Sequence, residues 1–130
     1  MSWDLLVMRL PEGTASLTAL PSRFEPEVMG TQRKVVEILG NLGVEWVSLE
    51  NRPMGVLRSE GFVLEIELPV GPVDHVVLSL HGAAAVDAAR TVLETLDATA
   101  VDLDTDLVVD VSAPDSRRQA QRTLDAACLA

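Results

Sequence analysis

Alternation of apolar and polar residues predicts a strand at the start of the chain and a helix after it. Residues 2–10 alternate until Pro11, which predicts a β-strand buried on much of both faces. Leu5, Val7 and Arg9 point to one side of this strand, and Leu6, Met8 and Leu10 to the other. Residues 12–30 contain two prolines and two glycines, which predicts a surface loop.

Residues 31–43 have the spacing of an amphipathic helix. The Thr31 hydroxyl can accept a hydrogen bond from a first-turn amide, and Gly43 is placed to end the helix. The segment 44–53 is ambiguous, because a short strand there would be ended quickly by Asn51 and Pro53. The apolar stripe of the helix consists of Val35, Ile38, Leu39 and Leu42.

Residues 54–82 predict three strands in succession. Turns at 59–61 and at Gly71-Pro72 separate them, and turns this short indicate an antiparallel meander. The middle strand alternates most strongly. Phe62, Leu64, Ile66 and Leu68 share one face of it, and Val63, Glu65 and Glu67 share the other.

Residues 83–98 predict a second helix, with Asp87, Arg90 and Glu94 on its solvent side. A terminal helix is expected after Ser112, which forms a variant capping box with Asp115. The buried stripe of the second helix consists of Val86, Ala89, Val92, Leu93 and Leu96.

These elements predict a single α+β domain over residues 1–130, in the order β-α-β-β-β-α-β-β-α. Helices that fall between groups of strands favour a two-layer sandwich, with a mostly antiparallel sheet of about five to six strands and the helices on one face.

Composition narrows the function classes. Hydrophobic residues make up 48% and charged residues 23%, which is typical of a folded domain. The formal charge of −10 argues against nucleic acid and anionic membrane as partners, because both are bound through Lys and Arg. A basic protein partner or a cationic ligand fits this charge better. The alternative is that the acidity serves solubility alone.

Cys128 is the only cysteine in the chain, so an internal disulfide is excluded. Its place on the apolar stripe of the terminal segment favours a small buried residue over a reactive thiol. The chain starts without the pattern of a signal peptide and contains no run long enough to span a membrane. We therefore expect a cytoplasmic protein.

The aspartate-rich run AVDLDTDLVVDV, residues 100–111, is either a metal site or a hairpin. Counted from Asp102, Leu107 and Ala113 stand where a calcium loop needs glycine and glutamate. We therefore favour a strand, a turn at residues 104–106 and a returning strand, because Asp and Thr side chains bond to turn amides.

Two histidines lie on the third strand of the meander, on the same face. His75 and His81 would be about 20 Å apart on a straight strand, too far to share a metal ion. His81 alone precedes Gly82 and a helix start, where free amides can hold an anion. A structural role in this strand–helix turn is the simpler interpretation.

Paired carboxylates and a basic patch are the remaining candidates. Glu65 and Glu67 lie about 7 Å apart on one strand face, a spacing that suits acid–base chemistry or a cation but is also typical of any solvent-facing strand. The basic patch on the terminal segment indicates a solvated helix face or a contact for an acidic partner. It consists of Arg117, Arg118 and Arg122.

Four segments of the chain carry a pattern shared with other proteins. They are SWDLLVMRLP (2–11), LPSRFEPEVMGT (20–31), GVLRSEGFVLEIELP (55–69) and VVLSLHG (76–82). Together they resemble a family of small bacterial proteins of unknown function, over most of the chain and through Asp110. In that family several glycines follow the last segment, whereas here Gly82 is followed by three alanines. The resemblance implies a bacterial, cytoplasmic protein and carries no activity.

Three interpretations of function remain open. The first is a non-enzymatic binding or regulatory module, such as an immunity-like inhibitor of a basic toxin or an adaptor, and it involves neither a cofactor nor a metal. The second is a ligand-binding protein or small enzyme with a site near the start of the second helix. The third is a homodimer formed through the exposed sheet face or a sheet edge. The candidate ligand-binding residues are His81, Gly82, Glu65 and Glu67.

Overall fold

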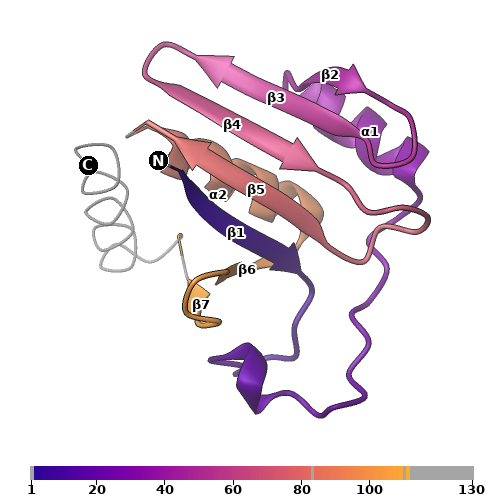
Figure 1. The fold of residues 1–130 in the computed structure, drawn as a ribbon, viewed down its shortest axis with the longest axis vertical. Helices are drawn as coiled ribbons and strands as arrows, with labels where there is room; N and C mark the ends of the chain where they lie inside the picture. Colours follow the sequence, from indigo (N-terminus) through magenta and orange to yellow (C-terminus); the bar gives the residue numbers. More distant parts are fainter. Residues whose placement is uncertain (1, 83, 110, 112–130) are drawn as a thin grey trace.

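The chain forms two layers in a computed structural model, which describes residues 2–82, 84–109 and 111 (Figure 1). Within these residues one layer is a sheet of seven strands and the other contains two α-helices, so the predicted α+β sandwich is confirmed. The elements are β1 (Trp3–Met8), η1 (Leu17–Ala19), α1 (Gln32–Asn41), β2 (Glu45–Ser48), β3 (Met54–Ser59), β4 (Phe62–Glu67), β5 (Val76–His81), α2 (Ala85–Leu96), β6 (Thr99–Asp102) and β7 (Val108–Val109).

The sheet is antiparallel throughout, in the order β2-β3-β4-β5-β1-β6-β7. Strands β3 to β5 form the predicted meander, and β2 extends it at one end. The first strand of the chain is central, because Leu5 lies opposite Leu78 of β5 on one side and Asp102 of β6 on the other. β1 thereby joins the two halves of the sheet.

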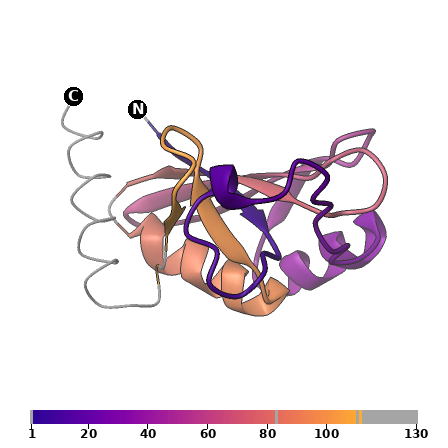
Figure 2. The same cartoon turned by 90° about the horizontal axis from the view of Figure 1, so that it is seen from below.

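Both helices lie on the same side of the sheet (Figure 2). We call the strand side chains beneath them the covered face. Leu5, Leu64, Ile66, Leu78 and Leu80 of this face are at most 1% exposed. α2 packs against β4 and β5, and its buried residues include the whole predicted stripe. The core of the protein therefore lies between the covered face and the helices.

The ends of α1 follow the sequence prediction. The Thr31 hydroxyl accepts a hydrogen bond from the amide of Lys34 at 3.1 Å, which satisfies one of the free first-turn donors. The helix ends at Asn41, and Gly43 follows with φ of 105°, a conformation that favours glycine. Val35 and Leu39 are buried, as expected.

The structure differs from the prediction in three elements. The ambiguous segment 44–53 contains β2, which raises the number of strands to seven; a register shift between Trp46 and Ser48 breaks the alternation that would have revealed it. The loop 12–30 contains the short helix η1, and the returning strand of the aspartate run is only two residues long. The terminal helix expected after Ser112 lies outside the described residues.

Within the described part of the chain, no helix has both the length and the apolar character needed to cross a membrane.

The two outer edges of the sheet have different surroundings. At β7, the backbone of residues 15–17 covers the edge: the amide of Val108 donates to the carbonyl of Ala15 and the amide of Leu17 to that of Asp106, both at 2.9 Å. At β2, no other strand or bridge of the described residues pairs with the outer side. The β2 edge is therefore open.

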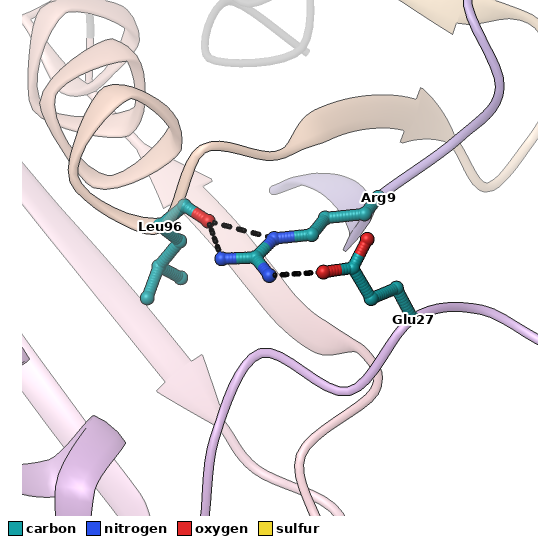
Figure 3. A network of polar contacts seen from close by, with 3 residues as sticks. All are labelled: Arg9, Glu27 and Leu96. Carbon is teal, nitrogen blue, oxygen red and sulfur yellow. Dashed lines mark hydrogen bonds and ion pairs between the residues drawn. The ribbon is translucent and has the colours of Figure 1, made fainter.

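Arg9 ties the long first loop to the helix layer (Figure 3). Its Nε and Nη2 donate to the backbone carbonyl of Leu96 at 3.3 and 3.1 Å, at the end of α2 where free carbonyls need donors. Its Nη1 donates to Glu27 at 2.9 Å. Arg9 thus points to the covered side of β1, as its alternation with Leu5 and Val7 predicts.

Candidate functional site

The strand side chains that point away from the helices form the candidate site, which we call the open face. Residues directly opposite each other in a sheet share a face, so the strand register defines its rows. The first row crosses four strands with Leu6, Val77, Glu67 and Met54. The second row consists of Asp4, Ser79, Glu65, Val56 and Glu45, and the third of His81, Val63 and Arg58.

The open face ends toward β6. Val101, directly opposite Leu6, is fully buried although it lies on the same side of the sheet. Figure 2 shows the turn between β6 and β7 rising from the sheet on this side, away from the helices. The solvent-accessible part of the open face therefore lies mainly on β1, β3, β4 and β5.

The open face combines apolar and acidic side chains. Leu6 and Val77 are half-buried at its centre, and Met54 is 45% exposed. Its rows contain four carboxylates, Asp4, Glu45, Glu65 and Glu67, but only one guanidinium, that of Arg58. A second guanidinium, that of Arg52, comes within 3.8 Å of Glu67 from the side. The surface is thus electronegative with an apolar centre.

The structure brings two of the candidate site residues together. His81 Nε2 lies 3.0 Å from Glu65 Oε1, across adjacent strands β5 and β4, and the two form an ion pair when the imidazole is protonated. Nε2 is shielded from solvent, and it makes no hydrogen bond to another described residue. This pair could not be predicted from the sequence, because it depends on the register between two strands.

Glu67 and Gly82 have other surroundings. Glu67 lies one row away from Glu65, between Val77 and Met54. Gly82 has φ of 91°, and a Cβ placed on it would lie 2.3 Å from the carbonyl oxygen of Gly61. Glycine is therefore required at position 82 by the close approach of the β3–β4 turn, a steric reason that involves no ligand.

The start of α2 does not favour an anion. The amide of Ala85 donates to the carbonyl of Gly82 at 3.1 Å, so one of the first-turn donors is already used. Asp87 adds a negative charge in the first turn. A bound anion at this helix start would be repelled by that carboxylate.

The aspartate run forms the predicted strand, turn and strand. Asp102 accepts hydrogen bonds from the amide of Asp104 at 2.8 Å and from the indole of Trp3 at 3.2 Å, so both of its oxygens hold the turn in place. The Thr105 hydroxyl accepts a bond from the amide of Leu107 at 3.3 Å. Across the described residues, no three or more His, Cys, Asp or Glu side chains converge as metal ligands.

His75 belongs to a separate contact. It precedes the first residue of β5, whereas His81 is the last, so the two imidazoles lie at opposite ends of the strand. His75 Nδ1 lies 2.8 Å from Asp74 Oδ1. The basic patch of Arg117, Arg118 and Arg122 and the thiol of Cys128 lie outside the described residues.

A cavity of about 430 Å³ was not predicted from the sequence. It lies between the second half of α2, the β6–β7 pair and residues 10–14, and it is bordered by Arg90, Glu94 and Asp97. Within this border, Arg90 Nη1 lies 3.7 Å from Glu94. Thr14 also lines the cavity, and its hydroxyl donates a hydrogen bond to the carbonyl of Pro11. Its walls come from segments far apart in the chain, which is why no local pattern indicated it.

No family model matches the chain, and no curated protein or solved structure is significantly similar to it. The resemblance to a family of small bacterial proteins therefore stays a prediction. The functional argument rests on the geometry and charge of the open face.

Proposed function

We propose that the protein is a non-enzymatic binding module whose open face engages a basic protein partner. The observation that carries this proposal concerns the sheet face that neither described helix covers. On it, the carboxylates of Asp4, Glu65 and Glu67 alternate with the apolar side chains of Leu6 and Val77. Such a surface offers both components of a protein interface, apolar area at the centre and charge around it.

Electrostatics selects the class of partner. The chain carries a formal charge of −10, and the open face shares that sign. An electronegative surface attracts a basic partner over distances up to the Debye length, about 8 Å at physiological salt, and repels acidic competitors. Binding should therefore be fast and should weaken as salt concentration rises.

A second candidate function uses the contact between His81 and Glu65. An imidazole held 3.0 Å from a carboxylate can orient a small ligand or accept a proton from one. His81→Gln separates the two candidates. Loss of ligand-induced stabilisation with partner binding intact supports a small-ligand site, and unchanged stabilisation removes His81 from it.

Capture of the partner followed by a matched pair of variants tests the main proposal. Tagged protein is incubated with lysate of its source organism at low salt, and the retained protein is identified by mass spectrometry and purified. The variant Asp4→Asn/Glu65→Gln/Glu67→Gln neutralises the open face. The control Glu12→Gln/Glu25→Gln/Glu37→Gln removes the same charge from exposed residues elsewhere.

We expect a basic partner whose affinity falls about tenfold or more for the open-face variant, which corresponds to about 1.4 kcal/mol. The control should stay within about threefold, because a uniform change in net charge is largely screened. An acidic or neutral partner, or equal losses in both variants, would overturn the proposal.

A further inference from the structure

We infer that the basic partner binds by adding an extended strand of its own to the outer edge of β2. This inference rests on the proposed function and names the backbone contact through which the partner is held. Strand addition uses the free amides and carbonyls of a sheet edge, and side chains on either side of the added strand provide specificity.

The two edges of the sheet differ in whether another described segment pairs with them. The β7 edge is already occupied by residues 15–17 through the hydrogen bonds of Ala15 and Leu17. The β2 edge has no pairing strand on its outer side within the described part of the chain. A strand can therefore be added at β2 without displacing any strand that the structure describes.

The side chains at the β2 edge are apolar and exposed. Val47 is 74% exposed and Leu49 is 61% exposed, and Val47 is the most exposed large hydrophobic residue of the described chain. Proteins protect free edges with lysine, proline, bulges or short strands. β2 is short and carries a register shift, which are two of these protections. However, it has the exposed Val47 at a position where a charged residue would discourage pairing.

The β2 edge is also packed closely against α1 and β3. The indole of Trp46 donates a hydrogen bond to the carbonyl of Val36 in α1 at 3.2 Å. Opposite Trp46, a Cβ added to Gly55 would lie 2.9 Å from the Trp46 ring and 2.6 Å from Val44, so only glycine allows this close packing. An edge that is already ordered loses little entropy when a strand binds to it.

Charge identifies the added strand as basic. Residues 44–51 contain Glu45 and Glu50 and no lysine or arginine. Glu45 also lies in the same row of the open face as Glu65, so cationic side chains on the added strand would continue the contact already proposed. A second copy of this chain would instead bring another Glu45 and Glu50 to the edge, together with a formal charge of −10. We therefore assign the edge to a segment with Lys or Arg flanking apolar residues.

Selection from a library of random linear 12-residue peptides, displayed against the full-length protein, tests the inference directly. The edge variant is Val47→Lys/Leu49→Lys. The control Leu103→Lys/Leu107→Lys adds the same charge to exposed apolar residues in the β6–β7 turn, at the opposite end of the sheet from β2. We expect enriched peptides that alternate basic and apolar residues, bind the control like the parent protein and bind the edge variant at least tenfold more weakly.

Backbone chemistry provides an independent readout that does not depend on folding of a variant. N-methylation of alternate amides in the best peptide removes strand hydrogen bonds without changing its charge, and it should abolish binding to the parent protein. Hydrogen exchange of the complex should slow at the amides of residues 45–48.

The outcomes separate this inference from the proposed function. Peptides that lose affinity for the Asp4→Asn/Glu65→Gln/Glu67→Gln variant but not for the edge variant overturn strand addition and leave the open face as the site. Failure to enrich any basic peptide overturns strand addition, whereas the captured partner and the open-face variant test the proposed function separately. A concentration-dependent dimer that is abolished by Val47→Lys/Leu49→Lys, measured by sedimentation, assigns the edge to a second copy and overturns the inference.

Discussion

The same strands build both faces of the sheet, but the covered face is apolar, whereas the open face mixes apolar and acidic side chains. On β4, Leu64 and Ile66 lie at most 1% exposed beneath the helices, whereas Glu65 and Glu67, which directly follow them in the chain, point to the open face. Because alternate residues of a strand point to opposite sides, a single segment can serve both layers. If the proposed function is correct, the covered face provides stability and the open face provides recognition.

The largest effect is expected on the covered face. Leu78 is fully buried and lies opposite Leu5 and Ile66. Leu78→Ala should lower the free energy of unfolding by about 2–5 kcal/mol, because it removes buried methyl groups and leaves a cavity. Its neighbour Val77 points to the open face, and Val77→Ala should cost only about 1 kcal/mol, since its side chain is half-buried. Urea unfolding measures both, and equal losses would contradict the separation of the two faces.

A smaller effect is expected where the chain passes from the sheet to the helix layer. Gly82→Ala should cost about 1–3 kcal/mol, because φ is 91° and the new methyl would meet the carbonyl of Gly61. Gly13→Ala is the matched control, because Gly13 has φ of 83° and open space around its Cβ position. Thermal unfolding of both should show the larger loss for Gly82. An equal loss of stability in the two variants would mean that position 82 requires glycine because of its positive φ alone, and not because of the contact with Gly61.

The smallest effect on stability is expected on the open face itself. The variant Asp4→Asn/Glu65→Gln/Glu67→Gln should change the free energy of unfolding by less than about 1 kcal/mol, because exposed ion pairs such as His81 with Glu65 contribute little. Relief of repulsion among acidic groups should offset part of any loss. Unfolding curves at low and high salt give the measurement. A loss above about 2 kcal/mol would show that these carboxylates support the fold.

Local features of the fold were predictable from the sequence because local chemistry determines them. The alternation along β4, the capping of α1 by Thr31 and the turn of the aspartate run each depend on residues a few positions apart. Their physical causes, side-chain alternation and bonds from side chains to nearby amides, are contained in such short segments.

Long-range features were not predictable in the same way. The central place of β1, between β5 and β6, depends on pairings between residues far apart in the chain. The contact of His81 with Glu65 depends on the register of two strands, and β2 was obscured by the register shift next to Trp46. An exposed sheet face could be expected from helices that cover one side only, but its rows of side chains exist only once the sheet is assembled.

Hydroxyl-radical footprinting of the protein bound to its purified partner tests the central claim most directly. The account predicts protection of Leu6, Met54 and Val77 on the open face, with unchanged labelling of Ile38 on α1 and Val28 in the first loop. Protection of Ile38 or Val28 without protection of the open face would contradict it and place the binding surface on the helix side.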